Sequence, residues 1–220
     1  MADTPTPDDL FFTRAGLDPD RLTRIVADTL SGADDGELFL EYTQSEALTF
    51  DDGRLKTASF DTGQGFGLRC VAGEATGYAH ASDLSEAALK RAADAVQAVK
   101  HGHSGQMAAG PAPTNAHLYG DDNPLGGPTF EEKVKLLQEI DAYARAKDSR
   151  VRQVSASLSG EWQAVMILRA DGQLVRDIRP LVRMNVSVVA GDGDRQETGS
   201  FGTGGRESYT RFITQESWQG

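Results

Sequence analysis

Cysteine is almost absent from this chain of 220 residues, because Cys70 is the only one. A single thiol cannot form an internal disulfide and is typical of a reducing compartment, so we expect a cytoplasmic protein. No run of about 18 apolar residues is present that could cross a bilayer as a helix. Residues 1–10 are acidic and contain proline, unlike the apolar segment of a secretory signal. We therefore expect no membrane partner.

Basic residues are also scarce, since 22 lysines and arginines stand against 33 aspartates and glutamates, a net charge of −11. Nucleic-acid binding needs clustered cations that contact phosphates, so this balance argues against nucleic acid as a partner. The hydrophobic fraction of 39% and the aromatic fraction of 7% are ordinary for a soluble globular protein. A chain of this length can bury one sizeable core or two small ones.

Helical periodicity occurs at three places in the sequence. Apolar residues recur every three or four positions after Asp18, Asp83 and Thr129, and each of these side chains can cap a helix N-terminus. Glu86 and Glu132 stand three residues after the second and third caps, which predicts two capping boxes. The predicted helices are 18–31, 84–100 and 129–147.

Strand-like alternation occupies most of the remaining sequence. It is clearest at 181–190, where valines and Met184 share one face and Arg183 and Asn185 share the other. The predicted strands are 37–43, 48–50, 55–61, 66–71, 75–81, 151–158, 162–168, 173–178, 181–190 and 195–201. Turns are predicted at 52–53, 73–74, 159–160, 171–172 and 191–194.

Strands in runs between helices predict an α+β fold rather than a doubly wound one. We expect two subdomains, each with a mostly antiparallel sheet packed by long helices. Residues 101–128 hold six glycines and four prolines in 28 positions, which predicts a linker. The predicted domains are a flexible tail at 1–17 with a short helix at 10–12, a first subdomain at 18–100, the linker at 101–128, and a second, truncated subdomain at 129–220.

No complete catalytic or metal-binding pattern is present in the sequence. His101 and His103 lie two apart in the predicted linker with no further ligands at a suitable spacing, and His80 and His117 are expected at the surface or a strand edge. Cys70 lies in an apolar strand pattern, which predicts a buried, inert thiol. Neither His-Glu-x-x-His nor the variant with three intervening residues occurs. We assign no catalytic and no metal-binding residue.

A glycine-rich stretch near the end of the chain is the strongest candidate for ligand binding. Glycines expose backbone N–H groups, and a neighbouring guanidinium can bind a carboxylate or a peptide carbonyl. Arg183 and Arg206 belong with Arg179 to the one basic cluster of the second half. The candidate substrate-binding residues are Gly204, Gly205, Arg206 and Arg183. The alternatives are a plain glycine turn and, for Arg183, an internal salt bridge.

Several of these segments together resemble the TldD/PmbA family, and in particular its TldD branch. In the first half they are DGRLK at 52–56, QGFGLR at 64–69 and GEATGYA at 73–79. In the second half they are ASLSG at 156–160, DIRPLVR at 177–183, SV at 187–188 and GTGGR at 202–206. The resemblance extends from about residue 10 to the end of the chain, and the arginine-proline and Gly-Gly-Arg segments favour the TldD branch.

The resemblance implies a cytoplasmic zinc metallopeptidase that degrades or processes peptides and unstructured proteins, as a heterodimer with a TldE/PmbA-like subunit. The family binds zinc through His-Glu-x-x-x-His and a later cysteine, and this motif would lie downstream of residue 220. We therefore expect an N-terminal, non-catalytic portion that is inactive alone, holds no cofactor itself, and contributes to the substrate channel and the heterodimer.

Two other interpretations remain open. The chain could be a stand-alone binding or regulatory module without a peptidase half. It could also be a gyrase-interacting factor whose acidity imitates DNA, although its acidic residues are dispersed rather than gathered in a long run.

Overall fold

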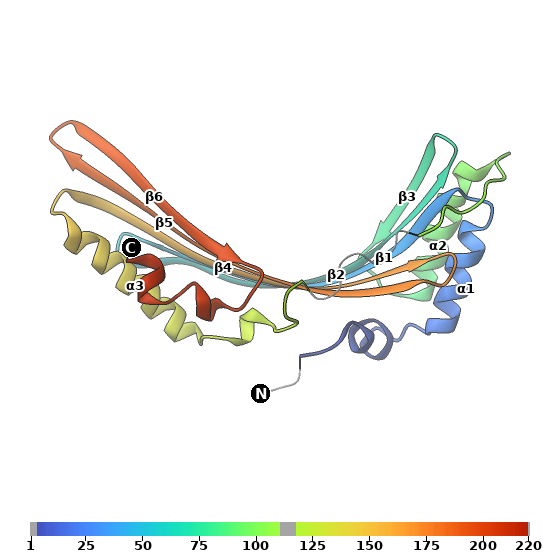
Figure 1. Ribbon diagram of the computed structural model, residues 1–220, viewed down its shortest axis with the longest axis horizontal. Coiled ribbons are helices and arrows are strands. Elements are labelled where there is room, and N and C mark those ends of the chain that lie inside the picture. The colour runs from blue at the N-terminus through green and yellow to red at the C-terminus, as the bar shows by residue number, and fades with distance from the viewer. Residues whose placement is uncertain (1–3, 111–117, 220) are drawn as a thin grey trace. The chain divides into compact units, whose positions relative to one another are not determined.

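The computed structural model describes residues 4–110 and 118–219 (Figure 1). The strands form one six-stranded antiparallel sheet in the order β3-β2-β1-β4-β5-β6. The α+β class is thus confirmed, but a single sheet replaces the two sheets that were expected. The strands are β1 (Asp35–Asp51), β2 (Arg54–Ala72), β3 (Ala75–Ala81), β4 (Val151–Arg169), β5 (Leu174–Asp192) and β6 (Arg195–Gly205). The longer helices are α1 (Pro19–Leu30), α2 (Glu86–Gln97) and α3 (Phe130–Lys147).

The described residues divide into two compact units that interleave along the sequence. Unit 1 comprises the described parts of 1–43, 63–118 and 163–178, and unit 2 those of 44–62, 119–162 and 179–220. Each of the strands β1, β2, β4 and β5 therefore contributes residues to both units. The sequence-based domain boundaries stay a prediction, and part of the predicted linker, 111–117, lies outside the described residues.

The four long strands correct several predicted breaks. Two short strands were expected in place of each of them, with a turn at Ser159-Gly160 in the third, but β4 runs through this pair without interruption. Gly160 is glycine for a packing reason, because a Cβ there would overlap the Tyr209 hydroxyl and come within 2.8 Å of Leu125. The predicted turns at Gly53, Gly73, Gly172 and Gly193 are confirmed, and each of these glycines has a positive φ.

Two of the three predicted helix caps are confirmed. The Asp18 carboxylate accepts a hydrogen bond of 2.8 Å from the Arg21 N–H, and Pro19 occupies the first helical position of α1. At the start of α3, Thr129 and Glu132 form the expected capping box, with hydrogen bonds of 3.2 and 2.7 Å.

The cap of α2 differs from the prediction. Ser85, not Asp83, is the N-cap, and its hydroxyl accepts a hydrogen bond from the Ala88 N–H at 3.2 Å. The Asp83 carboxylate instead accepts a hydrogen bond from the Ser85 hydroxyl at 2.8 Å. Because Ser85 rather than Asp83 caps the helix, α2 begins at Glu86, two residues later than the capping-box pattern predicted.

Unit 1 packs α1 and α2 together, and α2 also packs on β3. β3 lies antiparallel to β2, from Ala72 opposite Ala75 to Phe66 opposite Ala81. The segment expected to be a flexible tail contains a short π-helix, η1 (Asp9–Arg14). Leu10 within it is 4% exposed and Phe11 is fully buried, so apolar burial holds this part of the segment in place.

Unit 2 is built on the apolar face of its strands. Leu48, Leu158, Val182 and Met184 pack against α3, the 3-10 helix η4 (Tyr209–Arg211) and the short helix α4 (Gln215–Trp218). Within the part of the chain that the structure describes, no helix is long and apolar enough to cross a bilayer.

A buried ion pair lies inside this core. The Lys133 side chain is 3% exposed and pairs with Glu46, whose side chain is 12% exposed. The Lys133 ammonium also lies 4.9 Å from the centroid of the Tyr209 ring. Burial, together with the neighbouring Glu46 carboxylate, raises the pKa of the Tyr209 hydroxyl, which therefore stays protonated. The pair connects β1, α3 and η4.

A Gly160→Ala substitution tests whether this glycine is a packing residue. The added methyl group has to displace Tyr209 and Leu125, so we expect the free energy of unfolding to fall by about 1–3 kcal/mol. Gly199→Ala is the matched control on β6, because no atom lies within 4 Å of its Cβ position, and it should change stability by less than about 0.5 kcal/mol. Urea denaturation measures both, and equal effects would contradict the packing explanation.

Candidate functional site

The edge strand β6 is the most open element of unit 2. It pairs with β5 in an antiparallel register that runs from Asp192 opposite Arg195 to Val182 opposite Gly205. No described strand lies on its other side, and nearly all its residues are exposed. Four of its eleven residues are glycines. Such an edge leaves a row of backbone N–H and C=O groups available to another extended chain.

The register of β5 and β6 places three polar side chains of β5 on one open face. Arg183 lies opposite Gly204, Asn185 opposite Gly202, and Ser187 opposite Ser200. Residues opposite one another in an antiparallel pair share a face. Val182 and Met184 point the other way, into the core, and the described helices of unit 2 lie on that other side of its strands and leave the polar face uncovered (Figure 1).

Two shallow hollows meet at Arg183 on these strands. One has a volume of about 250 Å³ and is lined by Ser155, Ser157, Arg183, Asn185, Val186, Ser187, Ser200, Phe201 and Gly202. The other has a volume of about 510 Å³ and is lined by Leu181, Val182, Arg183, Gly202, Thr203, Gly204 and Gly205. The two glycines opposite Arg183 and Asn185 have no side chain that could fill the space, which explains why hollows form here.

Arg183 is the one cationic side chain in either hollow. Its Nε donates a hydrogen bond of 2.9 Å to the Asn185 side-chain oxygen. Across the described residues, no carboxylate forms an ion pair with it, so the predicted internal salt bridge is not seen. The outer guanidinium nitrogens therefore remain available to an acidic or carbonyl ligand.

The structure brings together only part of the predicted set of site residues. Gly204 and Gly205 end β6 beside Arg183, and a Cβ on Gly205 would lie 2.8 Å from the Phe212 ring. Arg206 follows the strand and stacks 5.4 Å from the centroid of the Tyr119 ring, and it lines neither hollow. A substrate-binding role for all four stays a prediction.

Sequence reasoning identified only some of the neighbours of Arg183. The alternation in residues 181–190 already placed Asn185 and Ser187 on its face. Ser200 and Gly202 could be added only from the pairing of β5 with β6, which the sequence pattern does not specify.

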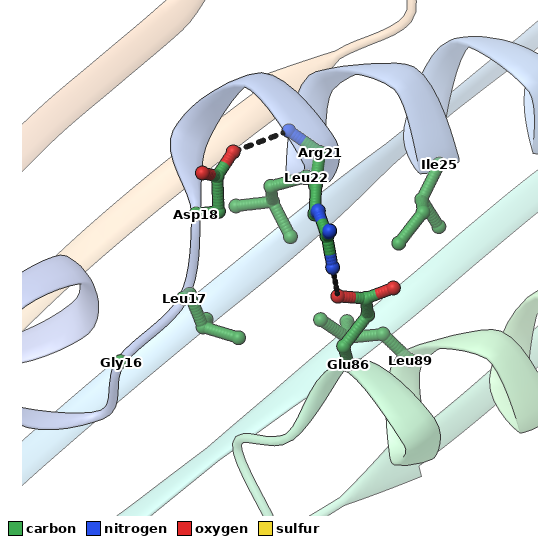
Figure 2. A pocket seen from close by; sticks show the side chains of 8 residues that line it. All are labelled: Gly16, Leu17, Asp18, Arg21, Leu22, Ile25, Glu86 and Leu89. Atoms are coloured by element: carbon green, nitrogen blue, oxygen red, sulfur yellow. Dashed lines mark hydrogen bonds and ion pairs between the residues drawn. The ribbon is translucent and has the colours of Figure 1, made fainter.

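A separate hollow of about 280 Å³ lies in unit 1, between the starts of α1 and α2 (Figure 2). Its polar groups already have partners. Asp18 caps α1, and Glu86 pairs with Arg21 at 3.1 Å and with Lys90 at 2.6 Å. Lys90 and then Arg21 lower the pKa of the Glu86 carboxyl. No nucleophile or convergent base is among its lining residues, so the arrangement is structural.

The described residues do not fit a zinc site. No group of three or more His, Cys, Asp and Glu among them could hold a metal ion, whereas zinc requires three or four such ligands. Cys70 is fully buried, and burial raises the pKa of its thiol, which disfavours the metal-binding thiolate.

One histidine and one carboxylate do lie close together in unit 1. His103 Nε2 is 2.8 Å from the Asp34 carboxylate, but the same carboxylate oxygen accepts a hydrogen bond of 2.6 Å from the Gly73 N–H. These contacts lower the pKa of Asp34, the Gly73 hydrogen bond having the larger effect. The pair fastens the segment around His103 to the start of β1. His117 lies outside the described residues.

Two family models match this chain. Residues 36–99 match the first domain, and residues 123–219 the central domain, of the PmbA/TldA metallopeptidases. Among curated proteins, the metalloprotease TldD homologue of Haemophilus influenzae is 40% identical over 184 residues. A second, from Buchnera aphidicola, is 34% identical over 185 residues. The matches cover 82% and 83% of this chain, which spans only 38% of the length of either relative.

Solved structures share the fold at low sequence identity. A Thermotoga maritima protein, described as a candidate modulator of DNA gyrase, has a TM-score of 0.69 at 17% identity, over 90% of this chain and 44% of its own. TldE from Thermococcus kodakarensis has a TM-score of 0.62 at 16% identity, over 91% of this chain and 46% of its own. At these identities the likeness concerns the fold alone.

Both domain matches assign the chain to a class of metallopeptidases. It belongs to the TldD/PmbA metallopeptidase family, whose first and central domains it contains. The predicted family resemblance is thereby confirmed.

Zinc retention by the purified 220-residue chain tests whether its residues form a zinc site. After incubation with zinc and dialysis against a chelator, we expect no stoichiometric metal by elemental analysis, because the described ligands do not converge. His103→Ala should leave this result unchanged. One tightly held zinc ion per chain would contradict the interpretation and would direct attention to the histidines.

Proposed function

We propose that this chain is the non-catalytic portion of a cytoplasmic TldD-type zinc metallopeptidase that degrades or processes peptides and unstructured proteins. In this proposal the zinc ligands lie elsewhere in the protein, in line with the 38% of the relatives' length that the chain spans. The 220-residue chain alone is then inactive. Its role is to guide the substrate and to contribute to assembly with a TldE/PmbA-like subunit.

The exposed edge of β6 is the observation that supports substrate guidance. A peptide that joins the sheet beside β6 forms main-chain hydrogen bonds, which every residue except proline can make in full. Such binding has little sequence preference and requires an extended, unstructured chain. Both properties suit an enzyme that accepts unfolded substrates.

A stand-alone binding module is the second candidate. The same edge would serve it equally well, since strand addition requires no catalytic group. The two proposals differ in the gene beyond the codon for Gly220, where a His-Glu-x-x-x-His motif supports the peptidase.

Strand addition can be tested with N-methylated peptides. The probe is a labelled, unstructured peptide of about ten residues in which threonine alternates with serine. N-methylation of every residue removes the donors from both peptide edges, and we expect binding at least about tenfold weaker. Methylation of every second residue leaves one edge intact and is the matched control, which should still bind. Fluorescence anisotropy measures the affinities.

Amide hydrogen exchange locates the binding site. Bound unmethylated peptide should protect the backbone amides of β6 and leave those of the opposite edge strand β3 unchanged. Protection of β3 alone, or equal binding of the fully methylated peptide, would overturn the proposed role of the β6 edge.

A further inference from the structure

We propose that the hollow around Arg183 recognises a carboxylate carried by the peptide strand that joins β6. This inference rests on the proposed function and adds a chemical preference to it. Main-chain pairing positions the peptide, and Arg183 then selects acidic residues or a free C-terminus at the place opposite Gly204.

The strand spacing places such a peptide within reach of Arg183. Neighbouring strands lie about 4.8 Å apart, so a strand beyond β6 would be about 9.6 Å from β5. The long side chain of Arg183 covers part of this distance between the two strands, and an acidic side chain of the peptide would cover the rest. The peptide residue beside Gly204 would present its side chain on the same face as Arg183, because laterally adjacent residues share a face.

The glycines of β6 keep this path open. A Cβ on Gly202 would lie 3.0 Å from the Asn185 side-chain oxygen and 4.0 Å from an outer nitrogen of Arg183. A Cβ on Gly204 would overlap the Val182 backbone carbonyl and lie 2.9 Å from the Arg183 Cα, so the close approach of β5 requires glycine at this position. β6 therefore lacks a side chain at both positions, and at Gly202 this leaves the space beside the guanidinium open.

The pairing of Arg183 differs from that of four other arginines of unit 2. Those four are paired with carboxylates within the described residues: Arg145 with Asp141 and Asp52, Arg150 with Asp148, Arg195 with Glu197, and Arg211 with Glu207. The net charge of −11 repels an acidic ligand at long range, so the preference depends on direct contact with the guanidinium. Arg183 is bound only by the neutral Asn185, which orients the guanidinium through its Nε and leaves the outer nitrogens for a carboxylate. Serine hydroxyls beside it can supply further hydrogen bonds.

Acetylated, amidated peptides that alternate threonine with glutamate, glutamine or lysine test the preference. We expect the glutamate peptide to bind the purified 220-residue chain about tenfold more tightly than the glutamine peptide, and the lysine peptide to bind most weakly. A glutamine peptide with a free C-terminus separates the two carboxylate sources, because tighter binding than its amidated form identifies a terminal carboxylate as a ligand.

Substitutions at Arg183 assign the preference to this side chain. In Arg183→Gln the ratio of glutamate to glutamine affinity should approach one, and Arg183→Lys should give an intermediate ratio because an ammonium lacks the bidentate geometry. Arg150→Gln is the matched control, since this exposed arginine pairs with Asp148 outside the hollows, and it should keep the full ratio. Arg183 is exposed, so these variants should fold, which circular dichroism verifies.

The outcomes separate the two proposals. If glutamate and glutamine peptides bind the unsubstituted chain equally, the carboxylate subsite is wrong while strand addition stands. A preference that survives Arg183→Gln also overturns the subsite. If none of the peptides binds, both proposals are wrong.

Discussion

The antiparallel register between β5 and β6 determines what unit 2 presents to its surroundings. Because side chains alternate along a strand, the packing of Val182 and Met184 into the core directs Arg183 and Asn185 outward. The register then places Gly204 and Gly202 of β6 opposite these two polar side chains. A shift of β6 by one residue would place other residues there and change what lies beside the guanidinium.

The buried Lys133–Glu46 pair supports the same arrangement from the core side. Two charges inside an apolar core require each other, since removing one leaves an uncompensated charge. Lys133 also lies beside the Tyr209 ring, and Gly160 leaves room for the hydroxyl of that tyrosine. η4, which follows β6 in the chain, is thus held against α3. η4 therefore connects the exposed edge strand β6 to the buried core of unit 2.

Local features of this fold could be read from the sequence, and non-local ones could not. The caps at Asp18 and Thr129 act over three residues, so the sequence predicted them correctly. The cap of α2 required a choice between Asp83 and Ser85, which local pattern did not decide. Gly160 was predicted to lie in a turn, because the reason for the glycine is a contact with Tyr209, which is distant in the sequence. Arg183 and Gly204 were named as candidates, but their position opposite one another follows from strand pairing, and the open face of the sheet is a property of the assembled fold.

The interleaving of the two units has a consequence for synthesis of the chain. Unit 1 includes residues 163–178, and unit 2 includes the described residues after 178 as well as residues 44–62. Neither unit can complete its fold while the ribosome is still adding these segments. β1 therefore stays without its partner β4 until more than a hundred further residues have been synthesised. Such long-range pairing slows folding and prolongs the time in which unpaired strands are open to aggregation. We therefore expect chaperones to improve the yield of folded protein during translation.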